Sequence, residues 1–324
     1  MPTSRRAFLR SLAAAPAVLP ALASAQAAWP ARPIRCIVPL PPGGGTDSTA
    51  RICMQRLSTA LGVPVVVENK PGAGGALGSE LLSKAEPDGY TIGIATASSH
   101  PAAPVFRKDL PYDPVTSFTP VTQLGTTPYI LIAGPAAGAR DLPGFIANAK
   151  AHPGKLTAAS AGVTTLGYLL TRQFELIAGL QMVDVPYKGS ALAYPELMNG
   201  SVAVMLDNPS GSAGLVRDGR LTGLAVTRRS PVLPDVPTFE SFGIQGFDAV
   251  FWYGIVAPAG LPAAIAQRIQ RALAETMLVE PGAGALRAID VEPVMSTPES
   301  FARTIAQQTA ELRALAARLG VKPE

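Results

Sequence analysis

The chain has 324 residues, of which 48% are hydrophobic and only 15% charged, and this balance excludes an intrinsically disordered protein. At about 150 residues per domain, the length predicts two domains. The formal net charge of +4 is small, and no run of Lys and Arg is longer than a pair such as Arg228-Arg229, which argues against nucleic-acid binding. Two histidines and two cysteines leave little material for a metal site or for histidine-based catalysis.

Residues 1–27 have the layout of a bacterial export signal. Arg5 and Arg6 precede an uncharged apolar stretch, residues 12–25, and small residues from Ala25 to Ala28 offer a cleavage site. Paired arginines are typical of a twin-Arg signal, and an ordinary secretory signal is the alternative. The stretch is shorter than the roughly 20 residues of a membrane span, so we expect a soluble periplasmic protein. Without Arg5, Arg6 and Arg10, the formal net charge of +4 falls to +1.

Along the rest of the chain, apolar runs alternate with segments of helical spacing, and this predicts an α/β fold with parallel-type sheets flanked by helices. Uncharged apolar runs suit strands that are buried on both faces of a sheet. The predicted strands are residues 34–40, 64–67, 90–96, 156–160, 182–186 and 202–206. The predicted helices are residues 50–61, 72–84, 164–178, 190–198, 262–277 and 298–319.

Two extended segments, residues 122–132 and 247–256, interrupt this alternation. The second is rich in β-branched and aromatic residues, which favour strands. We interpret both as strands that cross between two lobes, with a ligand cleft between the lobes. The alternative is two consecutive domains joined by a single linker. The boundaries predicted from the crossings are residues 28–124 plus 248–324 for lobe one and residues 125–247 for lobe two.

Cys36 falls in a predicted strand and Cys53 in a predicted helix. The periplasm is oxidising, so a disulfide between them is one interpretation. Twin-Arg substrates fold before export in a reducing compartment, and for this reason we favour two buried thiols.

Three Gly-rich loops of one type follow predicted strands and precede predicted helices, at residues 42–47, 160–165 and 187–190. Such loops present free backbone N–H groups at a helix start, where the helix dipole also attracts negative charge. Ligands of open α/β sheets bind at the carboxyl ends of strands. The three loops therefore predict an anionic ligand held between the lobes. The alternative is that these Gly and Thr residues only form turns and caps.

The predicted ligand-binding residues come from these loops and from the ends of other strands. In lobe one they are Pro42, Gly43, Gly44, Thr46, Asp47, Ser98, Ser99 and His100. In lobe two they are Ser160, Gly162, Thr164, Thr165, Tyr168, Tyr187, Lys188, Gly189, Asp207 and Asn208. We expect backbone N–H groups to be the main donors. Asp47 is expected to cap its helix, and Lys188 either pairs with a carboxylate or is solvated.

No motif for catalysis or nucleotide binding is complete. The chain has no Gly-Lys-Ser/Thr and no GxSxG, and Leu77 replaces the last glycine of a dinucleotide-binding pattern in residues 72–78. His100 follows a predicted strand and either binds the ligand, supports its loop or acts as a base, whereas His152 lies at a predicted helix end and favours the dipole there. We expect no enzymatic activity, no cofactor and no metal.

A set of short motifs occurs in a fixed order along the chain. They are residues 38–47 (VPLPPGGGTD), 67–75 (VENKPGAGG), 87–91 (PDGYT), 110–114 (LPYDP), 185–189 (VPYKG) and 252–254 (WYG). This ordered set resembles the tripartite tricarboxylate transporter solute receptors, the Bug proteins of proteobacteria, over essentially the whole mature chain. The resemblance implies a two-lobed periplasmic binding fold of type II. It also implies a small carboxylate held by backbone N–H groups and waters, and delivery to membrane permease subunits without catalysis.

One stretch departs from the pattern that the resemblance implies. Where the family has Gly-x-Gly-Ser/Thr-x-x-His, this chain has Thr164 for the second Gly and Tyr168 for the His. Because the phenol is larger and neutral, we hypothesise an aromatic or amide-like ligand. A sensor that signals to a membrane kinase is an alternative function, and a periplasmic hydrolase is a distant one. We expect a monomer.

Overall fold

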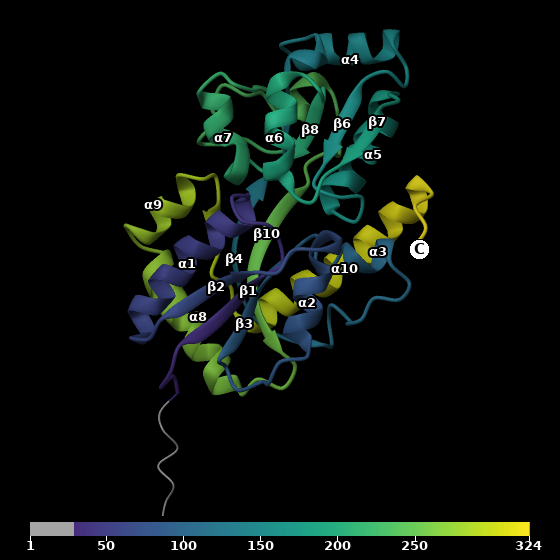
Figure 1. Cartoon of the computed structure of the whole chain (residues 1–324). Coiled ribbons are helices and arrows are strands. Elements are labelled where there is room, and N and C mark those ends of the chain that lie inside the picture. Colours follow the sequence, from purple (N-terminus) through teal and green to yellow (C-terminus); the bar gives the residue numbers. More distant parts are fainter. Residues whose placement is uncertain (1–28, 324) are drawn as a thin grey trace, which may run out of the picture.

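The computed structural model describes residues 29–323 and shows two lobes, each built around one β-sheet (Figure 1). The six-stranded sheet has the order β11-β4-β10-β3-β1-β2, and the five-stranded sheet has the order β7-β6-β8-β5-β9. We call the elements around these sheets the first and the second lobe. The predicted α/β class is confirmed. The predicted export signal lies outside the described residues.

The bounds of the elements follow the predicted alternation closely. The first sheet contains β1 (Ile34–Val38), β2 (Val65–Asn69), β3 (Thr91–Thr96), β4 (Phe118–Pro128), β10 (Val250–Pro258) and β11 (Glu292–Pro293). Its helices are α1 (Gly45–Leu61), α2 (Ala76–Ser83), α3 (Ala103–Phe106), α8 (Ala263–Met277), α9 (Gly282–Arg287) and α10 (Pro298–Leu319). The second sheet contains β5 (Ile130–Ala133), β6 (Thr157–Ser160), β7 (Val183–Pro186), β8 (Val204–Asp207) and β9 (Thr222–Val226). Its helices are α4 (Leu142–Ala151), α5 (Leu166–Ala178), α6 (Ser190–Asn199) and α7 (Pro209–Arg217).

Both sheets are mixed rather than wholly parallel. Strands β1, β2 and β3 are parallel to one another, as are β6, β7 and β8. Strand β10 runs antiparallel to β3 and β4, and β5 runs antiparallel to β8 and β9. Strands β5 and β10 each enter their sheet from the other lobe, whereas β11, which also pairs antiparallel with β4, follows α9 of its own lobe.

The two crossings lie side by side and are joined by hydrogen bonds. Strand β4 ends at Pro128 and β5 begins at Ile130, so the chain changes sheet across Tyr129. The buried Thr227 side chain accepts a hydrogen bond from the Tyr129 N–H (2.8 Å) and donates one to the Ala249 carbonyl (2.6 Å), just before β10. Thr227 thus links the outgoing crossing to the returning one. The exact lobe boundaries stay a prediction.

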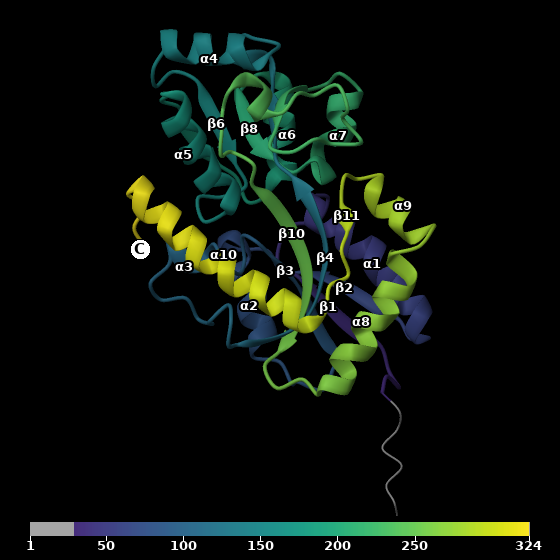
Figure 2. The same cartoon turned by 180° about the vertical axis from the view of Figure 1, so that it is seen from behind.

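Helix α10 lies across β4 and β10 on one face of the first sheet (Figure 2). The Trp252 and Phe301 rings meet edge to face at 5.1 Å, and the Trp252 indole N–H donates to Gln308 (2.6 Å). Gly254 leaves the space that the Phe301 ring fills, because a Cβ at this position would overlap the ring atoms. This contact fixes the last helix against a crossing strand.

The structure also shows where the two cysteines and His152 lie. Cys36 and Cys53 are free and fully buried, as favoured above, and burial raises the pKa of the Cys36 thiol to about 12. His152 follows the last residue of α4, where its Nδ1 lies 3.1 Å from the Asn148 carbonyl oxygen. Within residues 29–323, none of the helices combines the length and the apolar character that a membrane crossing requires.

Gly254→Ala tests the packing of α10 on β10. The added methyl would overlap Phe301, which is fully buried, so we expect a loss of roughly 1–3 kcal/mol in the free energy of unfolding, as for other overpacked cores. Urea denaturation measures this. The control is Gly214→Ala in α7, an exposed position with no atom within 4 Å of the new methyl, where a gain of up to about 1 kcal/mol is expected. Equal effects of the two variants would contradict the packing argument.

Candidate ligand-binding site

A cavity of about 60 Å³ lies between the lobes, at the starts of four helices. Its lining includes Gly44, Gly45 and Thr46 at α1, Thr165 and Gly167 at α5, Gly189, Ser190 and Ala191 at α6, and Asp207 and Asn208 before α7. A larger cavity of about 710 Å³ adjoins it and shares Leu40, Pro41 and Ala161 with its lining. The small cavity is thus the inner end of a space between the lobes.

Helix starts give this cavity its electrostatic character. The first N–H groups of a helix have no acceptor inside the helix, and the helix dipole adds partial positive charge there. The N–H groups of Gly45, Gly167 and Ala191 make no hydrogen bond to any residue within 29–323. These groups belong to one helix of the first lobe and two of the second. Together they form a site for an anion that needs no cationic side chain.

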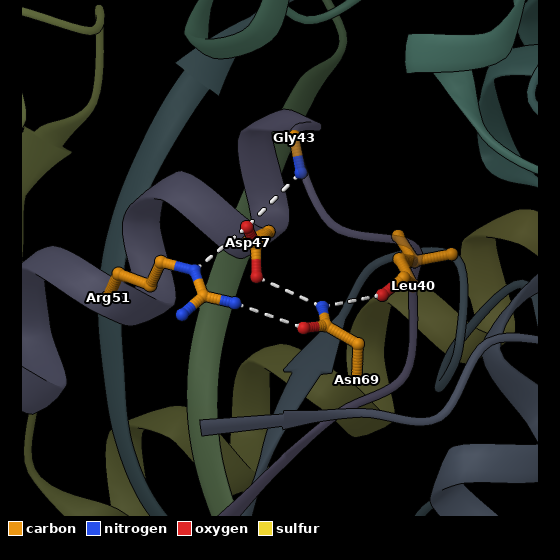
Figure 3. Close-up of polar contacts among 5 residues, drawn as sticks. All are labelled: Leu40, Gly43, Asp47, Arg51 and Asn69. Atoms are coloured by element: carbon orange, nitrogen blue, oxygen red, sulfur yellow. Dashed lines mark hydrogen bonds and ion pairs between the residues drawn. The ribbon is translucent and has the colours of Figure 1, made fainter. Parts of the chain in front are cut away.

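Asp47 holds the loop before α1 in place (Figure 3). Its Oδ2 accepts hydrogen bonds from the Gly43 N–H (3.1 Å) and the Arg51 guanidinium (3.0 Å), and its Oδ1 accepts one from Asn69 (2.9 Å). Asn69 also donates to the Leu40 carbonyl (3.0 Å). Burial acts to raise the pKa of Asp47, but these hydrogen bonds outweigh it and keep the pKa below its ordinary value.

The expectation that Asp47 caps α1 is wrong, because another residue holds the N-cap position. The helix begins at Gly45 with Gly44 as the N-cap residue, so Asp47 lies inside the first turn and its carboxylate reaches back to the loop. Its oxygen atoms are occupied by these partners, and its side chain does not line either cavity.

Asp207 is a second buried carboxyl group, and it does line the small cavity. Its Oδ1 accepts a hydrogen bond from the Ser190 hydroxyl (2.8 Å), and its Oδ2 accepts one from the Tyr194 hydroxyl (2.8 Å). Burial raises the pKa of this carboxyl above its ordinary value. Among residues 29–323, no Lys or Arg forms an ion pair with it.

Aromatic residues of the crossings complete the lining. Tyr129 and Phe251 both line the small cavity and meet edge to face at 5.9 Å. The Tyr129 hydroxyl is buried and has no hydrogen-bond partner in the described part of the chain, and burial raises its pKa well above the ordinary value. It is therefore a protonated donor without an acceptor. The Tyr253 hydroxyl, in contrast, lies 2.7 Å from the Ser210 hydroxyl of the second lobe.

The lobes touch closely around this cavity. The Ser98 hydroxyl of the first lobe accepts a hydrogen bond from the Leu166 N–H at the start of α5 (3.1 Å). A Cβ on Gly189 would lie 2.7 Å from the Pro41 ring, and one on Gly45 would overlap the Ser210 hydroxyl. The structure is therefore that of two lobes closed on each other, with glycine at the points of nearest approach.

Residues 49–321 match the sequence pattern of the family described as tripartite tricarboxylate transporter family receptor. The chain belongs to this family. BugT of Bordetella pertussis is 34% identical over 297 residues, which span 91% of each protein.

Solved structures agree with this assignment. The periplasmic binding protein BugD is 30% identical and superposes with a TM-score of 0.87 over 91% of this chain and all of BugD. An R. palustris protein solved with adipate gives the same values of identity, TM-score and coverage. MatC from Rhodopseudomonas palustris, solved with bound malate, is 28% identical with a TM-score of 0.84 over 89% of this chain and all of MatC.

The receptor brings most of the predicted site residues to the two cavities. Those that line the small cavity are Gly44, Thr46, Ser98, Thr165, Gly189, Asp207 and Asn208. Those that line the larger cavity are Gly162, Thr164, Tyr187 and Lys188. Those that line neither cavity are Pro42, Gly43, Asp47, Ser99, His100, Ser160 and Tyr168.

His100 supports a loop of the receptor instead of facing the cavities. Its ring is fully buried and lies 4.6 Å from the ring of Phe118, and its Nδ1 lies 3.1 Å from the Ser99 hydroxyl. Burial lowers the pKa of His100 to about 3, so the ring is neutral at physiological pH. The interpretation as a loop support fits these contacts better than a ligand contact or a base.

Tyr168 also points elsewhere. Thr165 caps α5, and Tyr168 in the first turn packs on Phe106 (6.1 Å between ring centres), with the Arg172 guanidinium 5.4 Å from its ring centre. The replacement of His by Tyr at this position therefore gives no direct support to an aromatic ligand. Ser160 is likewise buried outside both linings, with no partner for its hydroxyl among the described residues.

Sequence reasoning missed Tyr129, Phe251 and the pair Ser190 and Tyr194. Ser190 is the last residue of the third Gly-rich loop, so its position in that loop could have indicated that it lies at the cavity. Tyr129 and Phe251 lie in the crossing segments, where the pattern shows an extended chain but not which side chains face the cleft.

Asp47→Asn tests the loop anchor through pH. The folded pKa lies below the unfolded value, so the charged form stabilises the fold above about pH 4, and this contribution disappears as pH falls through the folded pKa. We expect the variant to lose about 1–3 kcal/mol in unfolding free energy at pH 7. The difference from the native chain should shrink below about pH 4.

Chemical denaturation between pH 2.5 and 7 measures this difference. Asp235→Asn is the control, because Asp235 is exposed and makes no side-chain hydrogen bond or ion pair within residues 29–323. Its effect should stay within about 0.5 kcal/mol at every pH. A pH-independent loss in Asp47→Asn would show that the charge is not what anchors the loop.

Proposed function

We propose that this chain is a periplasmic receptor that binds a small carboxylate between its lobes and delivers it to the membrane permease subunits of a tripartite tricarboxylate-type transporter. The observation that carries the proposal is the set of unpaired N–H groups at the starts of α1, α5 and α6 around one interlobe cavity. The adipate-bound and malate-bound relatives support a carboxylate as the ligand.

A carboxylate in the small cavity would accept hydrogen bonds from both lobes at once. The N–H groups of Gly45 and Thr46 belong to the first lobe, and the Gly167 N–H belongs to the second. The Tyr129 hydroxyl adds a donor from the crossing between them. Because the anion completes its hydrogen bonds only when both lobes contact it, binding favours the closed arrangement.

Within residues 29–323, cationic side chains line only the outer part of the space. In this described part of the chain, no Lys or Arg lines the small cavity, whereas Lys188 lines the larger one. We assign the inner cavity to one carboxylate and Lys188 to a second anionic or polar group nearer the opening. His100 is neutral and lies outside both linings, so the proposal includes no catalytic step.

A thermal-shift panel tests the ligand class. The full mature chain, stripped of ligand by unfolding and refolding, is mixed with di- and tricarboxylates, aromatic acids, acidic amino acids and neutral amides. A ligand at about 100 times its Kd stabilises the folded state by about 2.7 kcal/mol, which raises Tm by roughly 5 °C or more for a chain of this length. At least one carboxylate should give such a shift. A shift with amides alone would contradict the proposal.

Gly45→Ala tests whether closure of the lobes is needed for binding. The new methyl would overlap the Ser210 hydroxyl of the other lobe and would lie 2.9 Å from the Tyr253 hydroxyl of its own lobe. We expect the affinity for the ligand found in the panel to fall at least tenfold while circular dichroism stays unchanged. Gly214→Ala is the control, because Gly214 lines neither cavity and no atom of residues 29–323 lies within 4 Å of its methyl, and its Kd should change less than threefold. Calorimetric titration measures both. Equal affinities for the two variants would mean that the ligand binds without the contact between Gly45 and Ser210.

A further inference from the structure

One wall of the small cavity consists of hydrogen-bond acceptors. Asp207 ends β8 and is 4% exposed, and each of its oxygen atoms already accepts one hydroxyl hydrogen. The hydroxyls of Ser190 and Tyr194 direct their only hydrogen atoms to Asp207, so their oxygen atoms can only accept from a third group. Two donors aimed at both oxygen atoms fit the carboxylate form, because a carboxylic acid would need one of its oxygen atoms to donate.

The other groups around the cavity are donors. The N–H groups of Gly45 and Gly167 and the hydroxyl of Tyr129 have no acceptor within residues 29–323. The titratable groups close enough to influence Asp207 are the phenols of Tyr129, Tyr194 and Tyr253, all neutral. The cavity therefore offers donors for a carboxylate and, within about 60 Å³, a carboxylate acceptor that has hydroxyl partners but no cationic partner among residues 29–323.

We propose that Asp207 is a specificity-determining residue that selects carboxylates carrying a hydrogen-bond donor, a hydroxyl or an ammonium group, on the carbon next to the bound carboxylate. This rests on the proposed function, in which a carboxylate occupies the small cavity. The small volume requires the donor and the carboxylate of the ligand to be close neighbours.

The physical reason is the cost of desolvation. When the lobes close, Asp207 loses water, and its remaining lone pairs need a donor from the ligand. A hydroxyl or ammonium group supplies one, whereas a methylene group leaves a buried acceptor unpaired. Sites built around such a hydrogen bond reject the analogue that lacks the donor much more strongly than apolar pockets reject a change of size.

Matched pairs of acids test the proposal by isothermal titration calorimetry on the mature chain. The sets are succinate, malate and aspartate; adipate and 2-aminoadipate; and phenylacetate, mandelate and phenylglycine. Within the set that binds, the substituted acid should bind at least tenfold more tightly than the unsubstituted one. In Asp207→Asn this preference should fall below threefold, because the amide is neutral and brings donors of its own. Asp207→Ser provides the same comparison if the Asn variant does not fold.

Asp184→Asn is the matched control. Asp184 is a half-buried carboxyl in the second sheet that lines neither cavity, so its substitution should leave the tenfold preference intact. Equal binding of substituted and unsubstituted acids by the native chain would overturn the role of Asp207 and leave the receptor function standing. A preference that survives in both Asp207 variants would also overturn it. If no acid of the three sets binds, the selection by Asp207 is overturned, whereas the proposed function fails only if no carboxylate of the full panel shifts Tm.

Discussion

The pairing of β4 with β10 holds the two crossing segments side by side between the lobes. Antiparallel hydrogen bonds run from Phe118 to Pro128 on one strand, and Thr227 fastens the point where each crossing meets the second lobe. Tyr129 and Phe251 belong to these same segments and line the small cavity. The element that joins the lobes is therefore also part of the binding surface, so the cavity cannot change its shape independently of the crossings.

Within residues 29–323, the candidate site combines helix starts suited to an anion with a lack of cationic side chains in its inner part. Backbone N–H groups at helix starts are fixed in direction, whereas a lysine or arginine would adjust to many anions. The carboxylate of Asp207 would repel an anionic ligand bound next to it. The hydroxyls of Ser190 and Tyr194 and the N-terminal ends of α6 and α7 reduce the energy cost of this repulsion. Selectivity in this receptor can thus come from the placement of neutral donors and acceptors rather than from net charge.

The sequence predicted the elements and the backbone part of the site well, for physical reasons. Apolar runs that end in Gly-rich loops are local signals, and they placed Gly44, Thr165 and Gly189 at the cavity. The direction of a side chain is set by contacts distant in sequence. His100 turns to Phe118, and Tyr168 turns to Phe106, so neither lines the cavities. For the same reason the sequence did not indicate Tyr129 and Tyr194. The position of Tyr129 depends on the strand crossing, and that of Tyr194 on a hydrogen bond to Asp207.

The glycines at the points where the lobes touch have a consequence for sequence variation. Gly45 faces Ser210, Gly74 faces Thr164, and Gly189 faces Pro41, each across the gap between the lobes. At Gly45, where the backbone torsions suit any residue, a larger side chain would overlap the Ser210 hydroxyl of the other lobe and also lie close to the Tyr253 hydroxyl of its own lobe. Because the closer of the two contacts is with the other lobe, such a change would disturb the closed arrangement more than the fold of either lobe. A screen for expression or thermal stability would therefore register such a change less clearly than a direct measurement of ligand binding would.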